Sequence, residues 1–133
     1  MNVTQEKYYR MLVEDKPGVL SNVLTNLKEH SVDLKGLWGF GKGQGNGEII
    51  VVPKDPNQLN QVATTLGMTL QEGNCFCLTD DNKTGALVDV LHKVTAAGIN
   101  LHAVESIAVE GKFCCYMWCD ESDTSQLSQI LSS

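Results

Sequence analysis

An internal repeat constrains the fold of this chain more than any other feature of its sequence. Shifting the sequence by 67 positions places YYRMLVEDKPGVLSNVLTNLKEHSVDLKGL, residues 8–37, on CFCLTDDNKTGALVDVLHKVTAAGINLHAV, residues 75–104. Gly18 then meets Gly85, and Leu24 meets Leu91. The same offset places EIIVV, residues 48–52, on CYMWC, residues 115–119, without a gap. Two copies of one unit therefore make up nearly the whole chain of 133 residues.

Within the first copy, the period of the hydrophobic residues changes in a fixed order. Tyr9, Met11 and Val13 recur every second residue, which is typical of a strand with one buried face. After Pro17 the apolar residues follow a helical spacing that ends near His30. The remaining patterns predict two strands joined by a hairpin, a helix and a short fourth strand, at residues 31–40, 48–52, 55–67 and 67–71. This βαββαβ order predicts a ferredoxin-like unit, in which both helices cover one face of an antiparallel sheet.

The second copy repeats this order but stops early. Its strands and helices are expected at residues 75–80, 84–98, 99–109, 112–119 and 122–131. At an offset of 67, its fourth strand would begin beyond the last residue. The sequence thus predicts an α+β chain of two tandem units, residues 7–72 and 73–133, the second without its last strand. Residues 75–79 would then form a sheet edge, unless another segment or a partner chain covers it. Because each unit alone has little core, we expect self-association, most simply as a homodimer.

Charge and hydropathy exclude several classes of function. The formal net charge is −6 and the chain has no basic run, which argues against nucleic acid or an anionic membrane surface as the main partner. No apolar stretch approaches the length of a membrane span, and the first ten residues, MNVTQEKYYR, are polar where a signal peptide would be apolar. We therefore expect a cytoplasmic protein. The five cysteines are all in the second half, and their simplest interpretation is packed free thiols.

The segment VEDKPGVL, residues 13–20, joins the first strand to the first helix. Pro17 suits the first turn of a helix, and Gly18 leaves the free N–H groups of that turn open to an approaching anion. Alternatively, Pro-Gly is only a tight strand-to-helix connection. A similar loop recurs at residues 82–85, which favours a functional role for it.

EDKPGVLSNVLTNLKEHSVDL and TDDNKTGALVDVLHKVTAAGINL resemble the opening of an ACT domain. The usual pattern of that family is an acid, a Pro-Gly, a helix and a short entry to the second strand. The resemblance covers residues 7–132 as a tandem pair. The second copy departs from it, since Thr84 stands where the family has proline.

The resemblance implies regulatory binding of an amino acid at the seam between two ACT units. It also implies that each first loop faces the second-strand entry of the other unit. A first site would then combine Asp15, Lys16, Pro17, Gly18, Val19 and Leu20 with Asn100 and Leu101. A second site would combine Asn82, Thr84, Gly85, Ala86 and Leu87 with Asp33 and Leu34. The first site is favoured because it keeps the Pro-Gly.

The residue types in these two sets suit a free amino acid. Each set offers a carboxylate or amide for the ammonium group, and N–H donors at a helix N-terminus for the carboxylate. Alternatively, Asp15 and Asn82 only cap their helices, while Asp33 and Asn100 bond to turn backbone.

No catalytic arrangement of His, Ser or Cys is evident, and no metal or cofactor is expected. We therefore expect a sensor or regulatory subunit rather than an enzyme, partnered by an amino-acid biosynthetic enzyme or by a second copy. The alternative is a ligand-free interaction module. An enzyme with a catalytic cysteine is the least favoured interpretation.

Two further sequence patterns are explained by structure alone or leave their role open. GFGKGQGNGE, residues 39–48, has glycine at every second position, but it leads into a strand rather than a helix, so it predicts a flexible hairpin tip and no phosphate site. Tyr116 and Trp118 share one strand face. They belong either to the core or to a partner surface on the helix-free side of the sheet.

Overall fold

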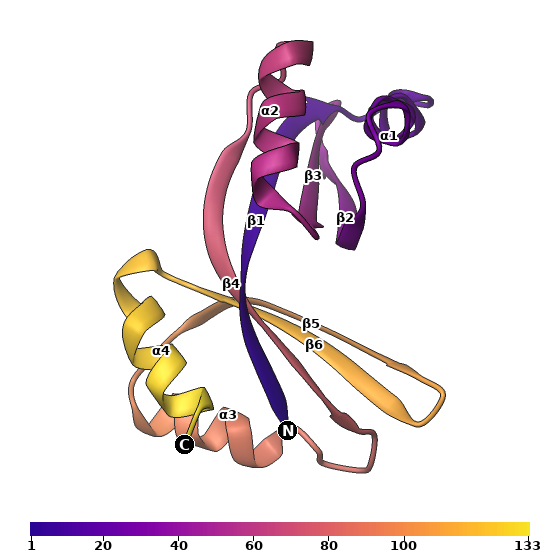
Figure 1. The fold of residues 1–133 in the computed structure, drawn as a ribbon. Helices are drawn as coiled ribbons and strands as arrows, with labels where there is room; N and C mark the ends of the chain where they lie inside the picture. The colour runs from indigo at the N-terminus through magenta and orange to yellow at the C-terminus, as the bar shows by residue number, and fades with distance from the viewer. The chain divides into compact units, whose positions relative to one another are not determined.

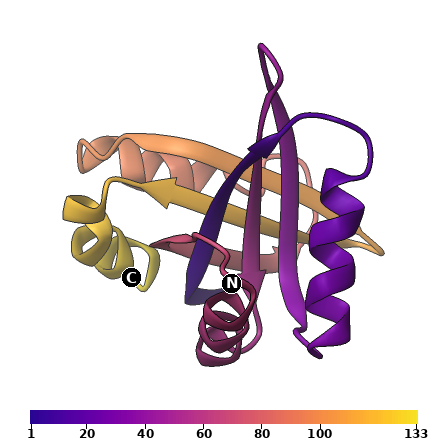
Figure 2. The same ribbon diagram turned by 90° about the horizontal axis from the view of Figure 1, so that it is seen from above.

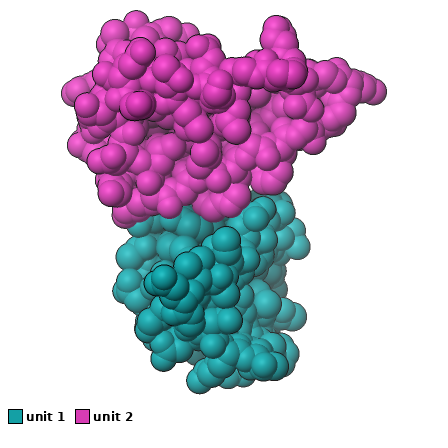
Figure 3. Space-filling model, turned by 90° about the vertical axis from the view of Figure 1, so that its right-hand side faces the viewer, with its two compact units in different colours: residues 1–6, 74–133 teal, residues 7–73 magenta.

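The computed structural model describes residues 1–133, and the chain divides into two compact units. Unit 2 comprises residues 7–73 and corresponds to the first copy of the repeat. Unit 1 comprises residues 74–133 together with residues 1–6, so it contains the second copy and the N-terminal segment (Figure 3). None of the helices is both long and apolar enough to cross a membrane.

Unit 2 is built from the elements that the sequence predicts, in the same order (Figure 1). They are β1 (Asn2–Glu14, shared with unit 1), α1 (Val19–Glu29), β2 (Leu34–Gly43), β3 (Asn46–Pro53), α2 (Pro56–Leu66) and the start of β4 (Gln71–Asp81). The side chain of Asp55 caps α2 by accepting hydrogen bonds from the backbone N–H groups of Asn57 and Gln58, and Pro56 occupies the first turn. Gly67 ends α2 in the left-handed conformation.

Unit 1 repeats the pattern with the rest of β4 as its first strand. The elements that follow are α3 (Val88–Ala96), β5 (Leu101–Val109), β6 (Lys112–Cys119), a short 3₁₀ helix (Glu121–Asp123) and α4 (Thr124–Leu131). The hairpins of both units close with two residues at positive φ, Gln44-Gly45 and Glu110-Gly111, a conformation that matches the twist of antiparallel strands. The hairpin predicted at residues 39–48 is present, and its strands extend to Gly43 and from Asn46, so that its turn is shorter than expected. Figure 2 shows the β2–β3 hairpin projecting as a narrow ribbon.

The N-terminal strand supplies the fourth strand of unit 1. Hydrogen bonding orders the strands β2-β3-β1-β4-β6-β5, so β1 is the neighbour of β4. Within unit 1, the terminal ammonium group of Met1 lies 3.4 Å from Asp80, and Gln5 bonds to Asn74, which places residues 1–6 antiparallel to β4. The chain indeed provides no strand after α4, as predicted. The β4 edge is nevertheless covered, because the polar N-terminal segment, expected to lie outside both units, is a strand.

Each unit has one core on the helix-bearing face of its sheet. In unit 2, Tyr9, Met11, Ile49 and Val51 of the strands pack with Leu27 of α1 and with Leu59 and Val62 of α2. In unit 1, Phe76, Leu78, Cys115 and Met117 pack with Val94 of α3 and Leu127 of α4. Helices on one face of an antiparallel sheet are the predicted fold class, which the structure confirms.

Three predicted details of this fold are wrong. Residues 67–70 are not a strand, since α2 ends at Gly67 and β4 begins at Gln71. The helix expected at residues 84–98 begins only at Val88, after a turn at residues 84–87. The repeat also needs a gap, because Tyr9 pairs with Val51 whereas its counterpart Phe76 pairs with Met117, 66 residues after Val51.

A β-bulge in β2 explains the gap. The register of the β2–β3 pair shifts between Gly41 and Gly43, which adds one residue, Lys42, that the β5–β6 pair lacks. The counterpart of Glu48 is therefore Cys114, not Cys115.

Tyr116 and Trp118 lie on the sheet face opposite the core of unit 1. Alternation along β6 puts them on the other side from Cys115 and Met117, which are core residues. Both side chains are buried, and their rings stack with centroids 6.1 Å apart. The two residues are thus on the helix-free face, and they are buried there.

The contribution of the N-terminal strand can be tested at Val3, which packs against the core of unit 1. Val3→Asp should destabilise the protein by about 1–3 kcal/mol, because it places a carboxylate against apolar side chains. Thr4→Asp is the matched control, since Thr4 is exposed and points to the other face of the strand. Urea unfolding measures both, and equal effects of the two variants would show that residues 2–6 do not pack on unit 1.

Candidate functional site

A pocket of about 220 Å³ lies in unit 2, between the first loop and the sheet. One side is formed by the end of β1, the loop and the start of α1, through Val13, Glu14, Asp15, Lys16, Val19 and Leu20. The other side is formed by β2 and β3, through Gly39, Phe40, Gly41, Gly47, Glu48 and Ile49. The structure thus brings together four residues of the first predicted site around one cavity: Asp15, Lys16, Val19 and Leu20.

The first turn of α1 is not capped by any side chain. The N-cap residue is Gly18, which has a φ of 91° in the left-handed region and carries no side chain to accept a hydrogen bond. Asp15 instead uses its backbone N–H to donate to the carbonyl oxygen of Gly45, at 2.9 Å. The alternative that Asp15 only caps α1 is therefore wrong. Val19 N–H donates to the carbonyl oxygen of Lys16, at 3.4 Å, so the N–H groups of Leu20 and Ser21 are the donors available to a ligand at this helix end.

Glycines form the floor of the pocket. Gly39, Gly41 and Gly47 lie on the helix-bearing face of the sheet, since Gly39 pairs with the core residue Ile49, and Gly41 pairs with Gly47. A Cβ atom added at Gly41 would clash with the Oδ2 atom of Asp15, so the carboxylate lies directly over this bare backbone. At Gly47, an added Cβ would approach the Cβ of Asp15 to 3.5 Å.

Sequence reasoning missed this floor, although its signal was present. Glycine at every second position of a strand removes the side chains from one face only. That pattern distinguishes a bare sheet face from a flexible loop, in which the glycines need no period.

The corresponding face of unit 1 is filled. With the one-residue gap, the counterparts of Gly39, Gly41 and Gly47 are Ser106, Ala108 and Phe113. The ring of Phe113 is buried in the core of unit 1, and Ala108 pairs with Phe113 just as Gly41 pairs with Gly47. The second loop therefore has no glycine floor beneath it.

The second loop uses one more of its backbone donors than the first loop does. Ala86 donates to the carbonyl oxygen of Lys83, as Val19 does to that of Lys16, and Val88 also donates to the carbonyl oxygen of Gly85, at 3.0 Å. The cap position of α3 is Leu87, and no side chain caps it, so Asn82 is not a cap either. Ala86 and Leu87 are half-buried against the core of unit 1, which leaves mainly Asn82, Thr84 and Gly85 exposed.

The remaining predicted residues are found in their own units. Pro17 and Gly18 form the exposed turn before α1 and do not line the pocket. Asp33 precedes β2 and accepts a hydrogen bond from Lys54 N–H through its carbonyl oxygen, while Leu34 begins β2. Asn100 and Leu101 stand at the start of β5 in unit 1. Their part in a site stays a prediction.

Ion pairs fix the charges around the pocket. Lys16 lies 2.7 Å from Glu14, and this hydrogen bond lowers the pKa of Glu14 and raises that of Lys16. Glu48 is buried and bonds to Arg10 and to Lys42, the latter at 2.8 Å. Burial by itself would raise the pKa of Glu48, but the bonds from Arg10 and Lys42 outweigh it and lower the pKa. Asp15 has no such partner among the ion pairs.

Several solved structures share this fold. Protein BT0572 from Bacteroides thetaiotaomicron aligns with a TM-score of 0.84 at 19% identity, covering 99% of this chain and 90% of that one. The regulatory subunit of aspartate kinase from Thermus thermophilus aligns with a TM-score of 0.66 at 12% identity, covering 98% and 94%. The structure of aspartokinase alpha and beta subunits aligns with a TM-score of 0.62 at 16% identity, covering 98% and 95%.

These likenesses give the chain an ACT-like fold. No protein-family model and no curated protein matches the sequence.

The ion pairs of Glu48 predict an acid-dependent stability. Because the folded-state pKa of Glu48 lies below its ordinary value of 4.5, its contribution is fully present above pH 4.5 and is lost as pH falls through the lowered pKa. Glu48→Gln should cost roughly 1.5–3 kcal/mol at pH 7, the value of hydrogen bonds to a charged group, and progressively less below pH 4.5. Urea unfolding between pH 7 and pH 3 measures this difference. A difference that stays constant over that range would contradict the assignment.

Proposed function

We propose that this protein is a regulatory amino-acid sensor, with a binding site in the pocket beneath the first loop of unit 2. The observation that carries the proposal is the cavity over Gly39, Gly41 and Gly47, which lies at the uncapped N-terminus of α1. The ACT-like fold shared with the aspartate kinase regulatory subunit supports a regulatory role rather than an enzymatic one.

The pocket offers complementary groups to a zwitterion. The N–H donors of the first turn of α1 suit the carboxylate of an amino acid, and the positive end of the helix dipole favours the same group. The Asp15 carboxylate over Gly41 suits the ammonium group. Val19 and Leu20 supply apolar walls.

The volume of the pocket limits the ligand to a small molecule. About 220 Å³ is below the roughly 300–1,000 Å³ of typical drug-sized sites, so a single free amino acid is a better match than a nucleotide or a peptide. The apolar walls favour a ligand with a short or apolar side chain.

The site draws on unit 2, and the sequence further predicts that Asn100 and Leu101 of unit 1 complete it. We retain this as part of the proposal, with Asn100 accepting from the ammonium group. Occupancy would then be transmitted to a partner, either an amino-acid biosynthetic enzyme or a second copy of the chain.

A ligand-free interaction module is the second candidate. The observation that favours it is the pair of exposed apolar side chains on one face of β5, Ile107 and Val109. Such residues suit contact with another protein.

A thermal-melt screen against the twenty amino acids separates the two candidates. At about a hundred times its dissociation constant, a ligand should stabilise the protein by roughly 2.7 kcal/mol, which shifts the midpoint by several degrees. Asp15→Ala should abolish the shift, and Asn100→Ala should reduce it. Glu29→Ala is the matched control, since Glu29 is an exposed acid at the other end of α1. If no amino acid shifts the midpoint, the sensor proposal fails and the interaction module becomes the favoured function.

The glycine floor can be tested at single positions. Gly41→Ala should weaken ligand binding about tenfold or more, because the new Cβ displaces the Asp15 carboxylate. Stability should change by less than about 1 kcal/mol, since an exposed side chain can rotate away. Gly39→Ala is the control, because its Cβ would meet only Leu20, at an ordinary 3.8 Å. Calorimetric titration measures both variants, and equal losses would argue against a specific role for Asp15.

A further inference from the structure

We propose that Cys77 and Cys114 in unit 1 form a reversible disulfide in the folded protein. Their Sγ atoms are 3.4 Å apart in the reduced structure, in which all five cysteines are free. A disulfide bond is about 2.05 Å long, so the two atoms need to approach by only about 1.4 Å.

The strand register explains why these two thiols meet. Cys77 pairs with Tyr116, and Cys114 pairs with Thr79, so the two cysteines are diagonal neighbours on adjacent antiparallel strands. The equivalent diagonal in unit 2 joins Arg10 to Glu48, which form an ion pair. The same position of the fold thus brings side chains into contact in both units, as an ion pair in one and a thiol pair in the other.

The other three cysteines are placed differently. Cys115 faces the core of unit 1, on the opposite side of the sheet from Cys114. Cys75 is fully buried, two residues before Cys77 on β4. Cys119 packs at the edge of the same core as Cys115. The register therefore selects a single pair.

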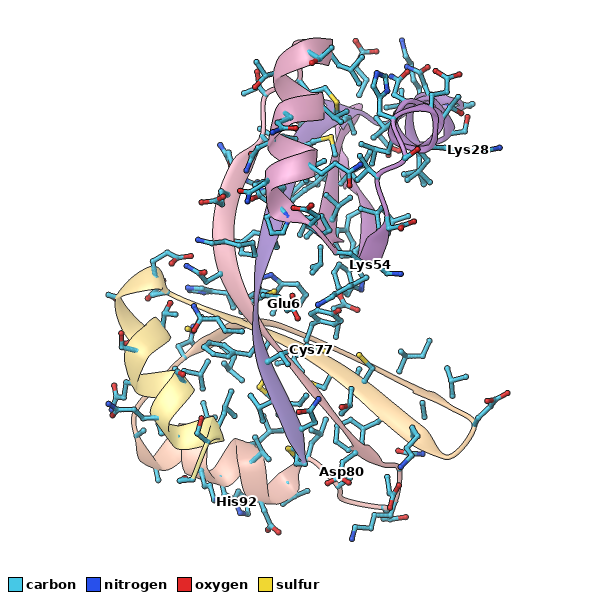
Figure 4. The ribbon with its side chains drawn as sticks, in the orientation of Figure 1. Glu6, Lys28, Lys54, Cys77, Asp80 and His92 are labelled. Carbon is cyan, nitrogen blue, oxygen red and sulfur yellow. The ribbon has the colours of Figure 1, made fainter.

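A small oxidant has a route to this pair. Both thiols are half-buried, and Cys114 lines an open pocket of about 580 Å³ together with Thr79, Asp80 and Lys112. Figure 4 labels Cys77 and Asp80 on β4. In this proposal, a low-molecular-weight disulfide such as oxidised glutathione reaches Cys114 through this pocket.

The reaction is a thiol–disulfide exchange in two steps. One cysteine thiolate attacks a sulfur of oxidised glutathione, which forms a mixed disulfide and releases one glutathione thiolate, and this thiolate takes up the proton. The second cysteine attacks the protein sulfur of the mixed disulfide and releases a second glutathione. Two protein thiols are oxidised to one disulfide, and one oxidised glutathione is reduced to two molecules of glutathione. Excess glutathione reverses the reaction.

The environment makes this exchange slow at neutral pH. Burial raises the pKa of the Cys77 thiol to about 12, and the hydrogen bond with Cys114 adds to the effect. Since only the thiolate attacks, the low thiolate fraction at neutral pH slows the oxidation of this pair.

The bond would join β4 to β6 across a loop of 37 residues. This segment contains α3 and β5, so oxidation restrains the part of the unit that carries the second loop. The oxidised form should therefore unfold at a temperature several degrees above that of the reduced form.

The test treats the full chain with oxidised glutathione, blocks the remaining thiols with an alkylating agent and maps disulfides by mass spectrometry of an unreduced digest. The expected result is one internal crosslink, Cys77 to Cys114, which glutathione or dithiothreitol reverses. Cys77→Ser and Cys114→Ser should each abolish it, and Cys119→Ser, also at a half-buried position, should leave it intact.

Two results would overturn the proposal. One is that Cys77 and Cys114 are recovered only as separate mixed disulfides with glutathione. The other is that crosslinks to Cys75, Cys115 or Cys119 are as abundant as the one between Cys77 and Cys114. Both readings come from the unmodified chain, so they do not depend on the folding of any variant.

Discussion

The pairing of backbone groups on β1 and β4 underlies the architecture of the whole chain. A ferredoxin-like unit needs a fourth strand beside its first, because otherwise a row of N–H and C=O groups lies unpaired at that edge. Each unit here obtains the fourth strand from the first strand of the other copy of the repeat. Residues 71–73 of β4 serve unit 2, and residues 2–6 of β1 serve unit 1.

This sharing has a direct consequence for the sites. β1 ends at Glu14, immediately before Asp15, and β4 ends at Asp81, immediately before Asn82. The strand that carries the first loop in unit 2 is thus also a structural strand of unit 1.

The two copies have diverged at the floor beneath the loop. Both loops anchor to their hairpin tips by the same bond, from Asp15 N–H to Gly45 in one copy and from Asn82 N–H to Gly111 in the other. The side chains at the floor positions differ in size, however, since Gly47 of one copy corresponds to Phe113 of the other. Phe113 is buried in the core of unit 1, whereas Gly47 lines the pocket of unit 2.

Periodicity in the sequence was sufficient to predict the order of most elements and the fold class. The two-residue period of Tyr9, Met11 and Val13 and the helical spacing after Pro17 reflect burial on one face, which is a local property. The N-terminal strand was missed because MNVTQE has no apolar alternation beyond Val3, and its pairing with β4 depends on contacts distant in sequence. The one-residue gap was missed because a bulge at Lys42 changes the register without disturbing the hydrophobic pattern.

The candidate site was predicted only in part, for similar reasons. The acid and the Pro-Gly identified the loop, and the structure places Asp15, Lys16, Val19 and Leu20 around one pocket. The glycine floor of the pocket was not predicted. Its glycines lack side chains, and their regular spacing was interpreted as the sign of a flexible hairpin tip. Burial of Ala86 and Leu87 in the second copy depends on tertiary packing, which the sequence pattern does not show.

The most direct measurement of the central claim is a backbone amide NMR titration with the amino acid that stabilises the protein. We expect the amides of Gly18, Val19 and Leu20 to shift together with those of Gly39, Gly41 and Gly47, while those of residues 82–87 shift little. Shifts centred on residues 82–87, with the glycine floor unchanged, would contradict the claim.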